Sequence, residues 1–575
     1  MSTSSPKLKQ APYGDADFME IRRNDLAFVD KTQFIETLES CGSRFPFIVR
    51  PRRFGKTLFT KILQAYYDKS AAKDFDFAFN GTYIDAHRTA LASQYYVIRF
   101  NFSSISVNNF LTGFIRQVRE GLVDFCDRYR FTEAYSLLDK SYSDPVDLLS
   151  AFLIKFNRNF DGKIFLIIDE YDQGANEVLS ADLQQFKHIT STGGVLKTFY
   201  SYLKYKSEGG PIGRIFLTGV TSISLDSMTS GFSIAKNISS YPVIATMYGF
   251  TEDELRQLIL QMVDLTTYKK SSDEIVSRMR ELYNGYRFSP VVPESVFNAS
   301  MCLYYLSYIQ DFGDEPDQFI DPAVANDLSK IHGILRLGRK EDVEEIVDLA
   351  VRHKRIPFGQ LPDILNLQSD GRFSKKGLLS VLIYLGYLTY APGENKELVV
   401  PNRAMSLQFF DVYFKFLRHF SKWEMTSRSA YAPALKSLAA GNARPLVETV
   451  ARVLNEASGI HSAAHLSESD FQSGLLVAGY LASGYDIATE VEVRGKDKGY
   501  IDLLFTSTTG GLSFLFELKY LSKSKGSDSA VEQAIAQAQK QAAQYVQGDN
   551  IKHIPNLQKV CVVFVGAEVK AYSSE

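Results

Sequence analysis

The sequence predicts an α/β protein in three parts: a parallel sheet covered by helices, a helical middle region, and a smaller C-terminal α/β unit. Three observations support this fold class. Near-continuous apolar runs alternate with helical segments over the first 250 residues, as expected for strands buried on both faces. Helical, heptad-like spacing follows up to about residue 450. The last stretch has the order helix, strand, strand, strand, helix, strand.

The length of the chain requires several domains. A chain of 575 residues is too long for one ordinary hydrophobic core. We expect a disordered tail over 1–12, an α/β domain over 13–250, a helical lid or connector over 251–450 and the smaller α/β domain over 451–575. The formal net charge of −2 gives no overall basic character, so nucleic-acid binding would depend on a local patch.

Cysteine usage and apolar stretches favour a reducing compartment. The four cysteines form no C-x-x-C pair, and His461 and His465 have no third ligand at a zinc-like spacing, so we expect neither a zinc site nor disulfides. The N-terminus lacks the apolar region of a signal peptide, and GLLVAGYLASGY is shorter than the ~20 residues of a membrane-spanning helix. We therefore expect an intracellular protein without membrane association, cytoplasmic or, in a eukaryote, nuclear.

Four strands are predicted in the first domain. They are FPFIVR (45–50), YYVIRFNF (95–102), KIFLIIDEY (163–171) and RIFLTGV (214–220). The segment GKTLFTKILQAYYD after the first strand predicts a helix that begins at Lys56.

The turn between the first strand and this helix has residues suited to binding phosphate. Gly55, Lys56 and Thr57 match the end of the pattern Gly-x-x-x-x-Gly-Lys-Ser/Thr, in which backbone N–H groups surround the phosphates, the lysine reaches the outer ones and the hydroxyl holds Mg²⁺. Arg50 stands where the pattern has its first glycine. A helix N-terminus at this turn would offer further N–H groups to an anion.

The third strand ends in an acidic pair. Asp169 followed by Glu170 fits an aspartate that binds Mg²⁺ and a glutamate that orients the attacking water. One strand is inserted between the two motifs, which is typical of the additional-strand class of P-loop NTPases. Thr218 at the tip of the fourth strand, with Thr221 as the alternative, would sense a γ-phosphate. An ordinary solvated turn is the alternative explanation of the acidic pair, but it does not explain why the phosphate-binding turn and the acidic pair occur in this order.

These blocks together resemble a known family. DFMEIRRNDLAFVDKTQFIETL, RPRRFGKT, IIDEYD, FLTGVTSIS, YGFTEDEL and LYNGYRFS are similar to the AAA-ATPase-like family that is usually joined to a C-terminal PD-(D/E)XK nuclease. The resemblance spans 13–300 and implies ATP and Mg²⁺ as cofactors and a homo-oligomer as one possible assembly. In this family an arginine normally stands where Arg50 replaces the first glycine of the phosphate-binding pattern. Candidate partners of the γ-phosphate are Arg52, Arg53 and Arg287. Two segments depart from the family pattern, GFSIAKNISSYPVIATM and FSPVVPESVFNASM, so the resemblance does not assign the lid or an arginine contact.

The C-terminal unit has a second set of charged residues on predicted strands. Gly499 and Asp502 in GYIDLLF form a G-x-x-D pattern, and Glu517 and Lys519 in LSFLFELKYL lie on one face of the next strand. Asp502, Glu517 and the carbonyl of Leu518 would hold Mg²⁺, with Lys519 near the attacking water. A salt-bridged amphipathic hairpin is the alternative.

Further residues favour the catalytic interpretation of this set. Gln541 and Tyr545 lie one turn apart on a predicted helix and resemble the Q-x-x-x-Y element of RecB-like nucleases, which lines the DNA side of the cleft. The same superfamily has an upstream helix carboxylate, for which Glu468 is the first choice and Glu490 the second.

The sequence therefore predicts a nucleotide-regulated DNA nuclease. One set of residues would bind and hydrolyse Mg-ATP, and a second would cleave phosphodiesters: Lys56, Thr57, Asp169 and Glu170 in the first, Asp502, Glu517 and Lys519 in the second. Two alternatives stay open: a nucleotide-switched interaction protein whose nuclease fold does not cleave, and an effector that acts in another cell. The choice between DNA and RNA also stays open.

Overall fold

The computed structural model divides the chain into two compact units. The first comprises Met1–Pro316, Gly333–Arg339 and Pro357–Asn402, and the second comprises Asp317–His332, Lys340–Ile356 and Arg403–Glu575. The structure describes residues 8–191, 193–222, 234–268, 270–322, 331–353, 355–359, 361, 368, 370–393, 396–413, 428–457, 466–482, 484–495, 499–508 and 510–575. Most of the predicted disordered tail, as well as His461 and His465, lies outside these residues.

The first unit is built on a five-stranded sheet in the order β2-β3-β4-β1-β5. All its described strand pairs are parallel. The strands are β1 (Pro46–Val49), β2 (Tyr96–Asn101), β3 (Ile164–Asp169), β4 (Ile212–Gly219) and β5 (Lys236–Asn237). The four predicted strands are thus confirmed. In the sheet it is β4 that lies between β1 and β3, while β2, which precedes β3 in sequence, forms the edge.

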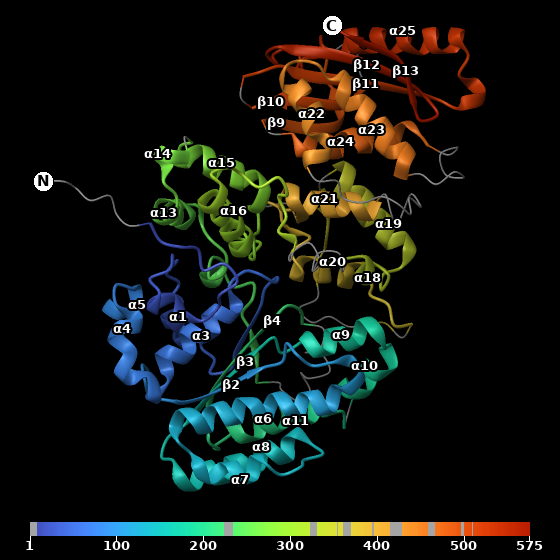
Figure 1. Cartoon of the computed structure of the whole chain (residues 1–575). Helices are drawn as coiled ribbons and strands as arrows, with labels where there is room; N and C mark the ends of the chain where they lie inside the picture. The colour runs from blue at the N-terminus through green and yellow to red at the C-terminus, as the bar shows by residue number, and fades with distance from the viewer. Residues whose placement is uncertain are drawn as a thin grey trace, which may run out of the picture. The chain divides into compact units, whose positions relative to one another are not determined.

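Helices cover both faces of this sheet. Arg99 of β2 contacts Thr60 of α3 (Lys56–Tyr67), whereas the next residue, Phe100, packs against α6 (Phe110–Tyr129) and α11 (Val195–Ser207). Because successive strand side chains point to opposite faces, α3 covers one face, and α6 and α11 cover the other. Figure 1 shows α6, α8 (Pro145–Asn159) and α11 gathered together, apart from α3.

Further helices belong to the first unit. They are α1 (Phe18–Arg23), α2 (Phe34–Ser40), α4 (Phe75–Phe79), α5 (Tyr83–Ala86), α7 (Tyr135–Leu138), α9 (Gln173–Ala181), α10 (Leu183–Thr190), α13 (Glu252–Met262), α14 (Leu265–Tyr268), α15 (Ser272–Tyr283), α16 (Ala299–Phe312) and α20 (Lys375–Tyr384). Capping boxes at Thr251 and Ser271 begin α13 and α15, since each side chain and the acid three residues later satisfy one another's backbone N–H groups. The hairpin β7 (Thr389–Tyr390) and β8 (Glu397–Val399) follows α20. The middle of the chain is helical, as predicted.

The second unit contains a mixed sheet in the order β13-β12-β11-β10-β9. Its strands are β9 (Tyr485–Val493), β10 (Gly499–Ser507), β11 (Ser513–Leu521), β12 (Leu557–Val565) and β13 (Glu568–Ser574). Among its described strand pairs, only β11 and β12 are parallel, and α25 (Asp528–Tyr545) forms the crossover between them. The predicted order of elements is confirmed, with β13 as an additional strand.

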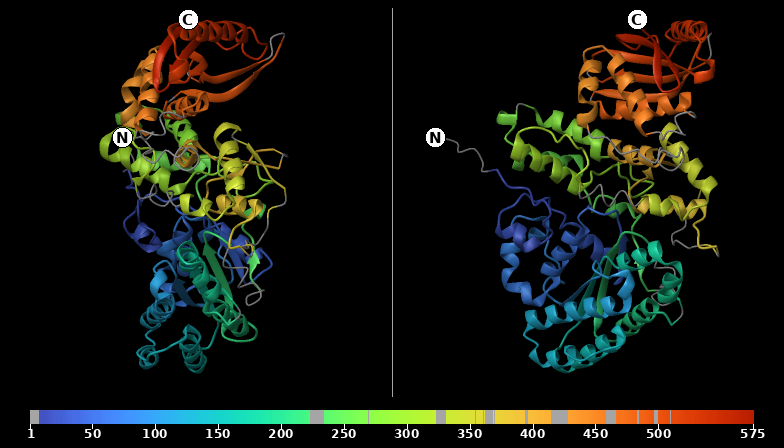
Figure 2. Two further views of the ribbon diagram at one scale, coloured as in Figure 1. Left: turned by 90° about the vertical axis from the view of Figure 1, so that its right-hand side faces the viewer. Right: turned by 45° about the vertical axis from the view of Figure 1, so that its right-hand side comes forward.

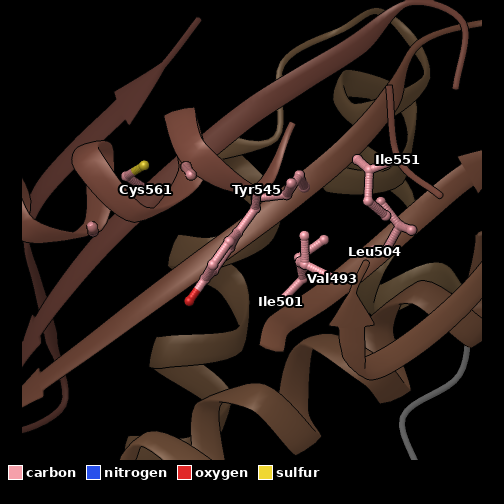
Figure 3. Close-up of a cluster of buried hydrophobic side chains, with 9 residues drawn as sticks. Val493, Ile501, Leu504, Tyr545, Ile551 and Cys561 are labelled. Carbon is pink, nitrogen blue, oxygen red and sulfur yellow. The ribbon is translucent and has the colours of Figure 1, made fainter. Parts of the chain in front are cut away.

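Two helices cover the faces of the second sheet. Residues of α25 join strand residues in a buried cluster that includes Ile501, Leu504 and Tyr545 (Figure 3). On the other face, α24 (Glu468–Leu481) approaches β9 and β10 so closely that a Cβ at Gly479 would lie 2.5 Å from the Phe505 ring. Figure 2 shows the sheet between these helices. The helices α19 (Lys340–Asp348), α21 (Arg403–Val412), α22 (Arg428–Ala439) and α23 (Arg444–Ala457) also belong to this unit.

Among the helices that the structure describes, none combines the length and apolar character needed to cross a bilayer.

Candidate nucleotide and nuclease sites

The phosphate turn folds around its lysine. Gly55 has a φ of +95°, a conformation that favours glycine, and caps the N-terminus of α3. Lys56 begins this helix as predicted, and its Nζ donates to the carbonyls of Arg50 (3.1 Å) and Pro51 (3.0 Å). Thr57 is the next residue of the helix. The unsatisfied N–H groups of this first helical turn are available to an anion.

A cavity of about 290 Å³ surrounds the start of α3. Arg53, Gly55, Lys56, Thr57 and Glu170 line its polar side. Its apolar wall comes from several segments remote in sequence, and includes Phe28, Val29, Tyr248, Phe250 and Leu258. The sequence blocks DFMEIRRNDLAFVDK and YGFTEDEL contribute to this wall, a role that sequence reasoning did not assign. A polar end beside an apolar wall fits a nucleotide.

The acidic pair lies beside the lysine. Asp169 is fully buried at the end of β3, and Glu170 has a φ of +52°, which is uncommon for a residue other than glycine. Lys56 Nζ lies 3.7 Å from Glu170 Oε1. Burial raises the pKa of Glu170, and the charge of Lys56 opposes that rise. Among the described residues, buried Asp169 Oδ1 and Glu170 Oε2 have no hydrogen-bond partner. Such carboxylate oxygens suit Mg²⁺ and its water ligands.

Arg99 is a member of this site that sequence reasoning missed. Its Nη2 donates to Asp169 Oδ2 at 2.8 Å, and its Nε donates to Thr60 Oγ1 at 3.3 Å. The two charged side chains are 13% and 0% exposed. An arginine inside the otherwise apolar strand YYVIRFNF was the available signal, because a buried charge requires a partner.

The two threonines proposed as γ-phosphate sensors are bonded within the protein. Thr218 is buried, and its hydroxyl donates to the carbonyl of Ile48 at 3.0 Å. The hydroxyl of Thr221 donates to Asp172 Oδ2, which also accepts the backbone N–H of Thr221. Asp172 accepts the N–H of Val220 as well. This buried aspartate, the last residue of IIDEYD, therefore fixes the loop after β4, another role that the sequence did not indicate.

The three candidate arginines lie in different surroundings. Arg53 is exposed, has a φ of +69° and lines the nucleotide cavity. Arg52 donates to the side chain of Gln173. Arg287 donates through Nε to the carbonyl of Pro293 at 2.9 Å. Of these three, Arg53 has the geometry closest to the predicted role.

The second acidic set lies where β10 and β11 pair. Leu503 pairs with Phe516, which places Asp502 opposite Glu517. Asp502 Oδ2 accepts the backbone N–H of Leu518 at 2.6 Å. Lys519 Nζ donates to Glu517 Oε1 at 2.8 Å. Glu517 is 2% exposed, and within the described part of the chain its Oε2 has no hydrogen-bond partner.

Burial perturbs all three charged groups of this set. It raises the pKa of Asp502 to about 6 and that of Glu517 to about 7, and repulsion by neighbouring carboxylates adds to each rise. Burial disfavours the charge of Lys519, but the hydrogen bond to Glu517 and the charges of the nearby carboxylates together outweigh it and raise the lysine pKa. A divalent cation would relieve this repulsion, and Asp502 with Glu517 supplies the oxygens it prefers. The described residues hold no cluster of three or more His, Cys, Asp or Glu side chains arranged as a metal site.

Both candidate upstream carboxylates lie near Asp502. Glu468 begins α24, its Oε2 accepts the backbone N–H of Tyr520 at 3.2 Å, and its charge contributes to the raised pKa of Asp502. Glu490 of β9 also raises the pKa of Asp502 and has a φ of +48°, an uncommon conformation within a strand.

The predicted helix pair lies against the start of β10. Burial raises the pKa of Tyr545, the charge of Glu517 adds to that rise, and the neighbouring side chain of Gln541 opposes it. A Cβ at Gly499 would come within 2.5 Å of the Tyr545 ring and hydroxyl. The glycine of the G-x-x-D pattern therefore makes room for Tyr545, whose hydroxyl points away from Leu504 and Ile551 in Figure 3.

Fold and sites together define a P-loop ATPase-like domain joined to a domain of restriction-endonuclease-like fold. The family models agree: residues 12–229 match the family described as "Predicted AAA-ATPase", and residues 467–573 match the PD-(D/E)XK nuclease superfamily. These matches confirm the resemblance predicted from the sequence.

Individual proteins are more distant. An uncharacterised protein in the vnfD 5′ region of Azotobacter chroococcum mcd 1 is 23% identical over 291 residues, which is 50% of this chain and 50% of that protein. The chain thus spans about half the length of this curated relative. A Walker-type ATPase of Pyrococcus abyssi aligns in structure over 70% of this chain and 98% of its own, with 13% identity and a TM-score of 0.34, too low to bear on the fold.

Proposed function

We propose that this protein is a nucleotide-regulated, Mg²⁺-dependent nuclease that cleaves DNA. One observation carries the proposal: Asp502 lies opposite Glu517 on paired strands, with Lys519 hydrogen-bonded to a glutamate whose other oxygen is buried without a partner among the described residues. A structural hairpin would have no need for a half-satisfied buried carboxylate.

In the nuclease domain each residue has a separate task. Asp502 and Glu517 would hold Mg²⁺, which on binding neutralises the charge that develops on the phosphate. The ammonium of Lys519 would sit beside the attacking water and stabilise the hydroxide formed from it. Glu468 would accept a proton or hold a further water, while Gln541 and Tyr545 would bind the nucleic-acid backbone.

In the ATPase domain the residues position and neutralise a triphosphate. Gly55 and the first turn of α3 would donate backbone N–H groups, Lys56 would exchange its two carbonyl partners for phosphate oxygens, and Thr57 and Asp169 would hold Mg-ATP. Glu170 would orient the attacking water. ATP as the nucleotide, DNA as the substrate and homo-oligomeric assembly are parts of this proposal.

The test measures both reactions on the same samples. ATP hydrolysis is followed with and without duplex or single-stranded DNA, and the DNA is then analysed on gels, for the wild type, Lys56→Ala and Asp502→Ala. We expect Mg²⁺-dependent cutting that Asp502→Ala reduces at least about a hundredfold while leaving ATP hydrolysis in place. Lys56→Ala should abolish hydrolysis and alter cutting.

The opposite result is equally informative. If wild type and Asp502→Ala leave DNA equally intact with ATP, ADP or no nucleotide, the nuclease proposal fails. ATP-dependent binding of DNA in the same samples would then favour the nucleotide-switched interaction protein.

A further inference from the structure

The first unit contains a second cavity, of about 370 Å³, next to the phosphate turn. Arg50 begins that turn, and it is among the residues that line this second cavity but not among those that line the nucleotide cavity. The second cavity is formed by residues of the turn, of the stretch around Phe288, and of α20 and the hairpin that follows it. Its volume falls in the range of small-molecule sites, roughly 300–1,000 Å³.

Among the described residues, Arg50 is a buried cation without an acidic partner. It is 2% exposed, and burial lowers its pKa to about 10. It donates to the carbonyls of Val49 (2.9 Å) and Ile244 (3.3 Å), and its guanidinium lies 4.2 Å from the centre of the Phe288 ring. Within the described residues no carboxylate pairs with it, and its buried Nε has no acceptor. A buried charge is costly unless a counter-ion compensates it.

Other residues of this cavity also favour an anion. Lys396 adds a second positive charge at an exposed position, and no aspartate or glutamate is found among the described lining residues. Ser380 on α20 is 3% exposed, and its hydroxyl has no hydrogen-bond partner in the described part of the chain. The cavity is thus lined by two cations and by a serine whose hydroxyl has no hydrogen-bond partner among the described residues.

Four aromatic side chains contribute to the wall of this cavity. Phe288, Phe358, Tyr384 and Tyr390 line the cavity, and the rings of Phe358 and Tyr390 lie 6.0 Å apart. Aromatic side chains offer flat apolar surface to a ring system, and the tyrosines add polar hydroxyls. This wall together with Arg50 and Lys396 suits a molecule with one anionic group and one flat ring.

From these contacts we infer that the cavity binds a small organic anion with an aromatic ring, and that this ligand acts on the nucleotide site through Arg50. The Arg50 side chain would bind the anionic group. The carbonyls of Arg50 and Pro51 hold Nζ of Lys56, so a shift of this residue changes the position of the phosphate-binding lysine. The ligand site does not depend on the proposed nuclease activity.

Binding is tested on the full chain by isothermal titration. The nucleotide site is first saturated with ADP and Mg²⁺, and the probes are AMP, UMP and indole-3-carboxylate, which separate nucleotide phosphates from aromatic carboxylates. We expect saturable binding of one probe class that persists in Lys56→Ala. Lys396→Glu should weaken it about tenfold or more, because it reverses an exposed charge at the cavity. Lys187→Glu, an exposed lysine of α10 outside the cavity, is the matched control.

A second variant separates ring binding from charge. Tyr390→Ala removes a half-buried side chain from the cavity wall and should weaken the binding of the same probe several-fold. Binding of no probe, binding lost in Lys56→Ala, or binding equally strong in Lys396→Glu and Tyr390→Ala would overturn the site.

Coupling between the second cavity and the nucleotide site is measured separately, through the Kd of each ligand in the presence of the other. The bound probe should change the Kd of ADP at least threefold, and ADP should change the Kd of the probe by the same factor, since coupling is reciprocal. Equal ADP affinity with and without the probe would overturn the link through Arg50.

Discussion

At the scale of single residues, the two acidic sites share one arrangement. Asp169 and Glu517 are both buried, and each has one oxygen 2.8 Å from a cation, Arg99 or Lys519. Within the described residues, the other oxygen of each lacks a hydrogen-bond partner. Each cation offsets part of the desolvation of its carboxylate, and the second oxygen is left available to a metal ion.

Removal of Arg99 should therefore destabilise the first unit. In Arg99→Met the side-chain volume is nearly kept, but Asp169 becomes a buried carboxylate without its cation, which costs about 3 kcal/mol or more. We expect the midpoint of guanidinium chloride unfolding to fall accordingly. Saturating Mg²⁺ and ADP should recover part of the loss, because a bound cation would compensate Asp169.

An exposed ion pair provides the control for this change. Arg23 pairs with Glu20 at 2.7 Å, with side chains 56% and 48% exposed, so Arg23→Met should cost less than about 1 kcal/mol. Equal losses in the two variants would show that Arg99 does not compensate a buried charge.

At the scale of elements, the sequence predicted the strands, but it predicted only some of the contacts between their side chains. Apolar runs located β1 to β4, because strands covered on both faces must be apolar along their whole length. The pairing of Arg99 with Asp169 depends on β2 and β3 meeting side by side, which one sequence does not encode locally. The same holds for Asp172, whose partners follow it by about fifty residues. In the second unit, local spacing did suffice, since Glu517 and Lys519 stand on one strand face.

The pair β10–β11 should give the second unit a distinctive pH dependence. In the folded protein, burial raises the pKa of Asp502 from 3.8 to about 6 and that of Glu517 from 4.5 to about 7. Between about pH 4 and pH 7 the folded state therefore binds more protons than the unfolded state, and the free energy of unfolding falls as pH rises. Glu517→Gln removes one of these groups. In EDTA, the wild type should therefore lose more stability than this variant as pH rises from about 5 to about 8. The difference in Tm, variant minus wild type, should become more positive over this range.

Melting curves of the wild type, Glu517→Gln and Glu532→Gln check this expectation. Glu532 is exposed on α25, so its variant controls for the loss of one negative charge. A Tm difference for Glu517→Gln that stays constant with pH would mean that the carboxyl group does not titrate in this range. In saturating Mg²⁺ the difference should reverse at high pH, because the metal competes with protons for the same oxygens.

At the scale of the whole molecule, the two candidate sites belong to two separate compact units. Each unit has its own sheet and buried core, which is the condition for separate cooperative unfolding. The nucleotide cavity belongs to the first unit, and the Asp502–Glu517 pair belongs to the second. Ligands of the two sites should therefore stabilise different transitions.

Calorimetry of the full chain tests this division. A ligand that binds only the folded form stabilises it by about 2.7 kcal/mol at one hundred times its Kd, so ADP with Mg²⁺ should raise the Tm of one of two transitions by several degrees. Lys56→Ala should remove that shift, whereas Asp502→Asn should leave it unchanged and lower only the response of the other transition to Mg²⁺. A single transition that moves as a whole with ADP would show that the units unfold together, and nucleotide binding would then act on the nuclease domain through shared stability.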